Sequence, residues 1–387
     1  MTTAARNIAI LGSTGSIGRS ALSVVGESDG RLRVIGLTAH SRLDDLCAQA
    51  KQFQPPWLVV TDADQAAKFD WSEKPAKSQL LYGQDGIETL VGQPEIDVVV
   101  AAMVGSVGLR GAWRALEAAK TVALANKETL VMAGPQVMEL AKARNAKILP
   151  IDSEHSAVFQ ALQSGRREDV KRVILTASGG PFRERSSQQL AEVTVEDALA
   201  HPTWSMGPKI TVDSATMMNK ALEIIEARWL FDLEPDQIDV VVHPQSIVHS
   251  MVEFRDGSVI AQLSPPDMKL PIQYALSYPE RWECPSPRLD LTEAMQLDFE
   301  PPDEERFPAL RLGHEVAAAG GTTGAVLNAA NEAAVQSFLD GQIPFTEIVP
   351  ACRSVLDGHH FEAKPSLEKL IELDGWARQE VTRWVCT

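Results

Sequence analysis

Residues 8–18 read IAILGSTGSIG, an apolar run that passes directly into glycines at positions 12, 15 and 18. Glycine lets a chain turn sharply from a strand into a helix and brings backbone N–H groups close to an anion. The spacing is GxxGxxG, whereas dinucleotide-binding sheets more often carry GxGxxG, so a tight turn without a ligand is the alternative interpretation. The stretch predicts the first strand and helix of a parallel sheet with a phosphate-binding turn.

Similar apolar runs recur and alternate with helical stretches as far as residue 151. The strand-like runs are 34–37, 58–60, 98–101 and 122–124, and helical stretches include 109–119 and 130–144. Continuously apolar strands are typical of a parallel sheet that is covered on both faces. The chain is therefore predicted to be an α/β protein with an N-terminal Rossmann-like doubly wound sheet over residues 1–151.

Shorter strands follow this region, at 173–175, 240–242, 251–254 and 259–261. Asp256-Gly257 predicts a hairpin between the last two strands. We expect a central α+β catalytic domain over residues 152–283 and a proline-marked linker over 284–306. A C-terminal helical bundle is expected over 307–387, with helices near 307–319, 323–338, 346–356 and 366–384.

The amino-acid composition limits the kinds of molecule that this protein can bind. The 387 residues contain 52 acidic and 36 basic side chains, a formal net charge of −16, which argues against nucleic acid or an anionic membrane as a partner. The four cysteines form no CxxC motif, so neither a zinc site nor a disulfide framework is predicted. We see no signal peptide, transit segment or membrane-length apolar run, and we expect a cytoplasmic protein.

The residues after the second strand predict the cofactor. Thr38-Ala39-His40-Ser41-Arg42 has no acid where NAD-binding sheets carry Asp or Glu, and Arg42 could meet a 2′-phosphate. NADPH is therefore expected. The simpler interpretation is that Ser41 caps a helix with Asp44 in its first turn, and both can hold together.

Asp152 and Glu154 follow the apolar run 148–151 and are one residue apart. In an extended segment both carboxylates would project from one face. Like charges at that distance call for a cation, and carboxylate ligands suit Mg²⁺ or Mn²⁺. His155 is expected to point to the opposite face and is left out of the metal ligands.

A second group of polar residues lies further along the chain. Asn219 and Glu223 are four apart on one helix face with Lys220 beside them, so the face could offer a carboxylate to a metal and donors to a phosphate. Glu226 shares that face, and spacing does not choose between Glu223 and Glu226. The simpler interpretation is a solvated helix with ordinary Lys–Glu pairs.

Two loops complete the candidate site. Ser178-Gly179-Gly180-Pro181 follows a strand and predicts an anion-binding turn, with a plain loop as the alternative. The segment 201–207, which contains His201 and Trp204, is typical of a lid that excludes water. Its alternative is a surface loop anchored by a buried tryptophan.

Six motifs occur in order: 12–18, 126–128, 152–155, 178–183, 201–207 and 213–223. Together they resemble the 1-deoxy-D-xylulose 5-phosphate reductoisomerase family, and Leu327–Glu332 extends the resemblance into the helical tail. The resemblance implies an NADPH domain, a catalytic domain, a helical bundle and a homodimer. It also implies that the substrate is a small sugar phosphate, which is rearranged and reduced to 2-C-methyl-D-erythritol 4-phosphate in the non-mevalonate isoprenoid route.

The resemblance also implies roles for single residues. The implied metal ligands are Asp152, Glu154 and Glu223, which selects Glu223 over Glu226. The implied cofactor contacts are Thr14, Gly15, Ser16, Ile17, Asn126, Glu128 and Gly207. His40, Ser41 and Arg42 join them as candidate cofactor contacts because of their place after the second strand. The implied substrate contacts are Lys127, Ser153, Glu154, Ser178, His201, Ser214, Asn219, Lys220 and Glu223. Asp152, Glu154, Glu223, Lys127, His201 and Trp204 are the implied catalytic residues, and Trp204 and Met206 would belong to the flap.

Three departures from the family pattern bear on these roles. His40 and Arg42 stand where the family often has Gly and Asn, which affects the 2′-phosphate contacts. Pro208 follows Gly207 where a basic or small residue is common, and predicts a stiffer flap. Ala177 stands where Gly is frequent. The rival functions are a metal-free NADP-dependent dehydrogenase and a non-catalytic nucleotide sensor.

Overall fold

The computed structural model describes residues 5–204 and 206–386, so the start of the chain, Ser205 of the expected flap and Thr387 lie outside it. The contacts divide the chain into two compact units. Unit 1 comprises Met1–Asn126, Val137–Ser156 and Asp267–Pro287, and unit 2 comprises Lys127–Gln136, Ala157–Pro266 and Arg288–Thr387. The predicted division at residues 151, 283 and 306 stays a prediction about separately folding parts.

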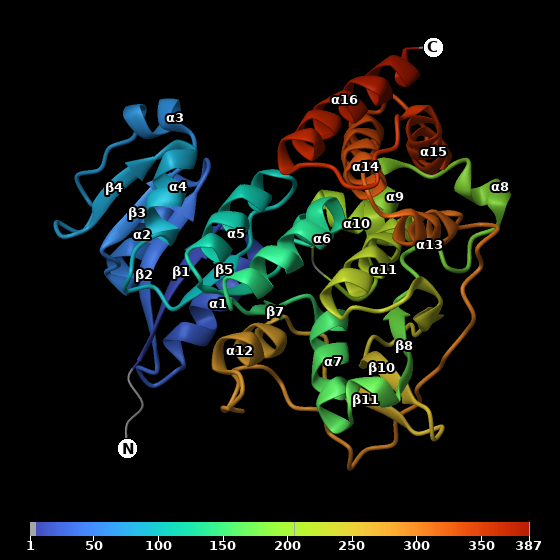
Figure 1. Ribbon diagram of the computed structural model, residues 1–387, viewed down its shortest axis with the longest axis horizontal. Helices are drawn as coiled ribbons and strands as arrows, with labels where there is room; N and C mark the ends of the chain where they lie inside the picture. Colours follow the sequence, from blue (N-terminus) through green and yellow to red (C-terminus); the bar gives the residue numbers. More distant parts are fainter. Residues whose placement is uncertain (1–4, 205, 387) are drawn as a thin grey trace. The chain divides into compact units, whose positions relative to one another are not determined.

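Unit 1 is built on a parallel sheet whose order in the described residues is β4-β3-β2-β1-β5-β6-β7 (Figure 1). Its strands are β1 (Arg6–Leu11), β2 (Leu32–Ala39), β3 (Trp57–Val60), β4 (Gln79–Tyr82), β5 (Val98–Ala101), β6 (Thr121–Leu124) and β7 (Ile148–Pro150). The strand order reverses beside β1, and ligands bind at the carboxyl ends of strands near such a switch point. The predicted Rossmann-like sheet is confirmed, and β4 is a strand that the sequence patterns did not indicate.

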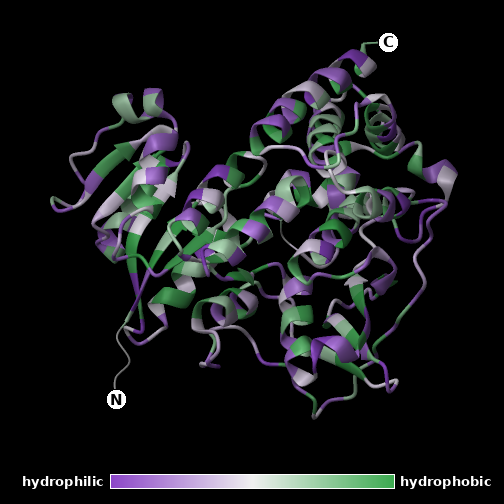
Figure 2. Ribbon diagram, in the orientation of Figure 1, coloured by the Kyte–Doolittle hydropathy of each residue, from purple (hydrophilic) through white to green (hydrophobic). Residues whose placement is uncertain are grey.

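The strands of this sheet are apolar because both of their faces are covered. All of β5 is buried, and Figure 2 shows the sheet largely in the hydrophobic colour. Helix α12 packs against α1, β6 and β7, while α4 packs against α5 and β3. The helices that lie in unit 1 are α1 (Ser16–Gly26), α2 (Leu43–Phe53), α3 (Ala63–Lys68), α4 (Gly83–Val91), α5 (Val107–Glu117) and α12 (Lys269–Ser277).

Two further helices each contribute residues to both units. Helix α6 (Glu128–Ala143) has a non-helical residue, Ala133, and carries Pro135 in its interior. The helix is kinked at Ala133. The internal proline removes a helical hydrogen bond and accounts for this kink. Helix α7 (Ser153–Ala161) begins just after β7.

Unit 2 contains a second sheet with the order β11-β10-β8-β9. Its strands are β8 (Val170–Ala177), β9 (Ile238–Val242), β10 (Val248–Phe254) and β11 (Val259–Leu263). Strand β10 is antiparallel to β8 and β11, whereas β9 is parallel to β8. Gly257 has φ +88° and donates its N–H to the carbonyl of Phe254 at 3.0 Å, so the predicted hairpin is confirmed.

Helices form most of the rest of unit 2, and α11 packs on this sheet. They are α8 (Ser187–Leu190), α9 (Val195–Leu199), α10 (Pro208–Ala215), α11 (Met218–Leu230), α13 (Ala309–Ala319), α14 (Thr323–Leu339), α15 (Ile348–Gly358) and α16 (Leu367–Val385). Helix α11 contacts β8 and β9 as well as α13. A helix covered on several sides is buried around its circumference, which places even charged residues of α11 inside the protein.

The predicted linker is irregular, and its far end joins the second sheet. Between 288 and 299 the chain forms no helix or strand, and Glu300 then pairs with Val242 of β9 in an antiparallel bridge. Among residues 5–204 and 206–386, no helix has both the length and the apolar character needed to cross a bilayer.

Candidate functional site

The glycine loop joins β1 to α1 in a turn that leaves no room for a side chain at Gly12 or Gly18. A Cβ on Gly12 (φ +85°) would lie 2.8 Å from the carbonyl oxygen of Ala102, and one on Gly18 would lie 2.4 Å from that of Gly12. The N-cap of α1 is Gly15, which has no side chain to cap the helix, and the nearby Ser16 is exposed. A helix N-terminus at the switch point is suited to a pyrophosphate.

The three residues after β2 are exposed at the carboxyl edge of the sheet. His40 Nδ1 lies 2.8 Å from the hydroxyl of Thr61, and Ser41 and Arg42 face solvent. The N-cap position of α2 is occupied by Arg42 without a side-chain cap, so the alternative role of Ser41 as the cap is wrong. Asp44 lies in the first turn, as expected.

Asn126 organises the loop that follows β5. Its Nδ2 donates to the carbonyls of Met103 at 2.7 Å and Gly105 at 3.0 Å. A Cβ on Gly108 would lie 2.8 Å from the Asn126 side chain, so α5 approaches it closely. Asn126 belongs to unit 1, whereas the next residues of the motif, Lys127 and Glu128, belong to unit 2.

The acid pair lies at a strand-to-helix junction, and the expected extended segment is wrong. Strand β7 ends at Pro150 and α7 begins at Ser153, so Glu154 lies in the first helical turn. The N–H of Glu154 donates to Asp152 Oδ1 at 3.2 Å, and the Ser153 hydroxyl bonds the Glu154 carboxylate. The helix dipole favours negative charge at this position, which an extended strand end would not provide.

His155 does not face away from the acids. It is fully buried, and its Nδ1 lies 3.3 Å from Asp152 Oδ1. Residues three apart share one face of a helix, and therefore the expectation drawn from an extended backbone fails here. His155 and the Asp152 carboxylate therefore lie side by side.

Unit 2 gathers three of the candidate residues around the buried carboxylate of a fourth, Glu223. Glu223 is completely buried, and it accepts from Asn219 Nδ2 at 2.5 Å and from Lys220 Nζ at 2.5 Å. Lys127 Nζ donates to Asn219 Oδ1 at 2.7 Å and lies 3.5 Å from Glu223. Glu226 is also buried, so the alternative of a solvated helix face is wrong.

A break between two helices sets the positions of these residues. The chain of α10 ends at Ala215, and Met217 adopts φ +62° before α11 begins at Met218. Asn219 and Lys220 therefore lie in the first turn of α11, where N–H groups and the dipole favour an anion. Ser214 lies on α10, just before the break.

His201 links two serines from different parts of unit 2. Its Nε2 lies 3.2 Å from the Ser178 hydroxyl and 3.1 Å from that of Ser214. Its Nδ1 accepts backbone N–H bonds from Thr203 at 3.1 Å and Trp204 at 2.9 Å. Nδ1 thus carries no proton and Nε2 holds the ring hydrogen, in keeping with the burial that lowers the pKa of His201.

The loop that presents Ser178 depends on two glycines. Gly179 and Gly180 have φ +83° and +66°, and a Cβ on Gly180 would lie 2.6 Å from the carbonyl oxygen of Ser214. The Ser178 hydroxyl accepts from the N–H of Gly180 at 3.2 Å. This compact turn resembles an anion-binding nest, which supports the expected turn over a plain loop.

The described part of the expected flap borders α10. Trp204 is half-buried with its ring centroid 6.4 Å from that of His249, so it is not the core anchor of the alternative interpretation. Met206 is half-buried and Gly207 is exposed at the N-cap of α10. Pro208 occupies the first turn of that helix, where proline is favoured.

Sequence reasoning missed a charge network beside this site, in which the half-buried Lys209 faces two buried carboxylates. Lys209 Nζ lies 2.6 Å from Asp213 and 3.9 Å from Glu128, whose pKa is raised by burial. Asn331 of α14 donates to Asp213 at 2.9 Å. The four-residue spacing of Lys209 and Asp213 could have indicated the pair, but not its burial against α14.

Three family models match the chain. The model described as 1-deoxy-D-xylulose 5-phosphate reductoisomerase matches residues 8–134. The 1-deoxy-D-xylulose 5-phosphate reductoisomerase C-terminal domain matches residues 148–231, and the DXP reductoisomerase C-terminal domain matches residues 263–380.

Relatives and solved structures agree with these matches. A 1-deoxy-D-xylulose 5-phosphate reductoisomerase of Heliobacterium modesticaldum is 51% identical over 98% of this chain and 97% of its own. A solved structure of DOX-P reductoisomerase with NADPH, fosmidomycin and magnesium has a TM-score of 0.92 at 41% identity, covering 98% of each chain. The Zymomonas mobilis enzyme with NADPH has a TM-score of 0.90 at 42% identity, covering 98% of this chain and 99% of that one.

Proposed function

The chain belongs to the 1-deoxy-D-xylulose 5-phosphate reductoisomerase family, and from that premise we propose how its own residues serve the reaction. The protein is an NADPH- and divalent-metal-dependent enzyme that converts 1-deoxy-D-xylulose 5-phosphate to 2-C-methyl-D-erythritol 4-phosphate. It is both an oxidoreductase and an isomerase. The buried cluster of Lys127, Asn219, Lys220 and Glu223 is the observation that carries the assignment of residues.

The residues of unit 1 fit NADPH. The glycine-bounded turn supports Thr14, Gly15, Ser16 and Ile17 as the pyrophosphate site. The exposed cation Arg42, together with His40 and Ser41, fits the 2′-phosphate. Asn126 of unit 1 would complete the cofactor contacts together with Glu128 and Gly207 of unit 2. Asn126 also holds the loop after β5 in shape.

The acids fit a small hard cation. Asp152 and Glu154 in unit 1 and Glu223 in unit 2 offer only carboxylate oxygens, the donors that Mg²⁺ and Mn²⁺ prefer. We propose that these three hold one ion together with the substrate. When bound, such an ion polarises a carbonyl and lowers the pKa of a coordinated hydroxyl.

The substrate phosphate has a candidate site within unit 2. Ser178, His201 and Ser214 are joined by hydrogen bonds, and Asn219 and Lys220 open helix α11. Hydroxyl, amide and ammonium donors at a helix N-terminus suit a phosphate. Its binding energy would orient the reacting carbons.

The remaining residues have proposed roles around the reacting atoms. Lys127 would hold the substrate through its ammonium group, which already bonds Asn219 in the cluster. Ser153 would touch the substrate beside Glu154. Trp204 and Met206 would cover the site and exclude water while NADPH supplies hydride to the rearranged aldehyde.

Assembly, the alternative metal and cellular setting complete the proposal. Strand β11 is an edge of the second sheet and exposes Val259, Ile260 and Leu263, which supports a homodimer formed through that edge.

Mn²⁺ would replace Mg²⁺ on the same carboxylates. We propose a cytoplasmic enzyme that acts in the non-mevalonate isoprenoid route, with neither nucleic acid nor membrane as a partner.

The direct test follows NADPH absorbance with 1-deoxy-D-xylulose 5-phosphate as substrate. We expect oxidation that stops with EDTA and returns with excess Mg²⁺. Full activity in EDTA would favour the metal-free dehydrogenase instead. NADPH binding without oxidation, under any metal condition, would favour the nucleotide sensor.

A further inference from the structure

The segment 300–306 pairs with the second sheet beside the start of the loop 178–186, which joins β8 to α8 and is called the Ser178 loop here. Glu300 pairs with Val242 through main-chain bonds of 2.8 and 2.9 Å. Val242 is the register partner of Ala177, the residue just before Ser178, and the N–H of His243 donates to the Ala177 carbonyl at 2.7 Å. The end of the linker is therefore joined to the strand edge from which the loop departs.

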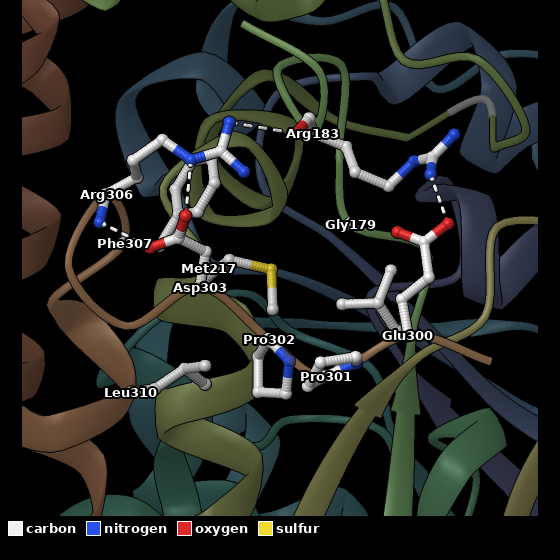
Figure 3. A pocket seen from close by; sticks show the side chains of 11 residues that line it. Gly179, Arg183, Met217, Glu300, Pro301, Pro302, Asp303, Arg306, Phe307 and Leu310 are labelled. Carbon is white, nitrogen blue, oxygen red and sulfur yellow. Dashed lines mark hydrogen bonds and ion pairs between the residues drawn. The ribbon is translucent and has the colours of Figure 1, made fainter. Parts of the chain in front are cut away.

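The same segment reaches the far end of the loop through one guanidinium. Arg306 Nη1 donates to the carbonyl of Arg183 at 3.1 Å (Figure 3). The same nitrogen donates to the carbonyl of Arg185 at 2.6 Å. Its Nε donates to Asp303 Oδ2 at 2.7 Å. Asp303 in turn accepts the N–H groups of Glu305 and Arg306, so the carboxylate that aims the guanidinium is itself fixed.

Side chains do not fill the space between the Ser178 loop and the segment 300–306. A cavity of about 50 Å³ lies there, lined by residues that include Gly179, Met217, Pro302 and Leu310 (Figure 3). Arg183 also pairs with Glu300 at 2.8 Å, but both side chains are partly exposed. Exposed ion pairs contribute little to stability. A planar guanidinium that bonds two backbone carbonyls, by contrast, restricts the backbone itself.

We propose that Arg306 is a positioning residue for the substrate phosphate, because it fixes the loop that carries Ser178. The inference rests on the proposed phosphate role of Ser178. Arg306 does not touch the phosphate; it sets the backbone of residues 183 and 185, which follow the Gly179-Gly180 turn. A loop free to move would misplace the Ser178 hydroxyl and weaken the binding of phosphate-bearing ligands.

The test compares Arg306→Ala, Arg306→Lys, Ser178→Ala and the double variant Arg306→Ala/Ser178→Ala in steady-state kinetics. Arg306→Lys keeps the charge and one donor and guards against misfolding. Arg311→Ala is the matched control, since Arg311 pairs with Glu304 on the same segment and its side chain is 54% exposed. Inorganic phosphate serves as a competitive probe of the anion site.

Arg306→Ala is expected to raise the KM for 1-deoxy-D-xylulose 5-phosphate and the Ki for inorganic phosphate by about tenfold. The KM for NADPH should change by less than about twofold. Arg306→Lys should give KM and Ki values between those of the parent and Arg306→Ala. Arg311→Ala should give the same values as the parent. The effects of Arg306→Ala and Ser178→Ala should be less than multiplicative, since both act through one contact.

Two results would overturn the inference and are distinguishable. If Ser178→Ala raises the substrate KM while Arg306→Ala and Arg306→Lys leave it unchanged, or if the double variant is fully multiplicative, the phosphate site stands and the role of Arg306 is refuted. If Ser178→Ala leaves the substrate KM and the phosphate Ki unchanged, the proposed phosphate site fails, and the inference fails with it.

Discussion

Glu223 shows how a buried charge can be held ready for a ligand. Its carboxylate has no exposed surface, and Lys220 and Lys127 balance its charge while Asn219 fixes one oxygen. A buried carboxylate without such partners would be costly. Spacing along the helix could not separate Glu223 from Glu226, because both lie on α11 and both are buried.

Glu223→Gln should lower metal-dependent turnover by at least about a thousandfold, since an amide keeps the shape but loses the charge that attracts the dication. NADPH affinity, measured by fluorescence titration, should change by less than about twofold. Glu226→Gln is the matched control on the same helix and should retain metal-dependent turnover. The reverse pattern, with loss only in Glu226→Gln, would transfer the ligand role to Glu226.

Arg42→Ala should reduce the preference for NADPH over NADH by about tenfold or more, because a charge-assisted bond to the 2′-phosphate is lost. The ratio of kcat/KM values for the two cofactors measures this preference. Arg33→Ala removes another exposed arginine, on β2, and should leave the ratio unchanged. An unaltered ratio in Arg42→Ala would place 2′-phosphate recognition elsewhere.

Lys209→Met should destabilise the protein by about 3–5 kcal/mol, because the buried carboxylates of Glu128 and Asp213 lose their neighbouring positive charge. Burial already raises the pKa of Glu128, and Lys209 opposes that shift. A raised carboxyl pKa stabilises the fold at low pH, and that stability is lost as the pH rises through the folded-state pKa. Urea unfolding should therefore show a larger deficit at about pH 8 than at about pH 5.5, and an equal deficit at both would contradict this account.

Elements with a strong local pattern were predictable, and those defined by distant contacts were not. The apolar run 98–101 is β5 without any change of bounds, because a continuous Val/Ala run suits a doubly covered strand. Strand β4 escaped notice because Gln79 and Tyr82 are not buried and the strand lies at the sheet edge. Asp152 and Glu154 were placed on a strand since nothing local showed that α7 begins at Ser153.

Gly180→Ala tests the Ser178 turn as an element. The added methyl would meet the Ser214 carbonyl at 2.6 Å in a backbone conformation that alanine disfavours. We expect kcat/KM for the sugar phosphate to fall by about tenfold or more, as the turn is forced off Ser214. Gly257→Ala is the control, with φ +88° but nothing within 4 Å, and should cost about 1 kcal/mol of stability without loss of activity. Equal kinetics in both variants would contradict the role of the turn.

The whole molecule is two units whose chain segments interleave along the sequence. The composition and the hydrophobic periodicity of the sequence predicted a parallel sheet followed by mixed and helical regions. They did not predict that residues 267–287 join unit 1. That grouping arises because α12 packs on α1, β6 and β7, which are distant in sequence. The candidate ligands are likewise divided, with Asp152 and Glu154 in unit 1 and Glu223 in unit 2.

The most direct test is a crystal structure with NADPH and Mn²⁺, measured at the manganese absorption edge. We predict one strong anomalous peak with carboxylate oxygens of Asp152, Glu154 and Glu223 about 2.1 Å away. A peak held by other side chains, or one that lacks Glu223, would contradict it.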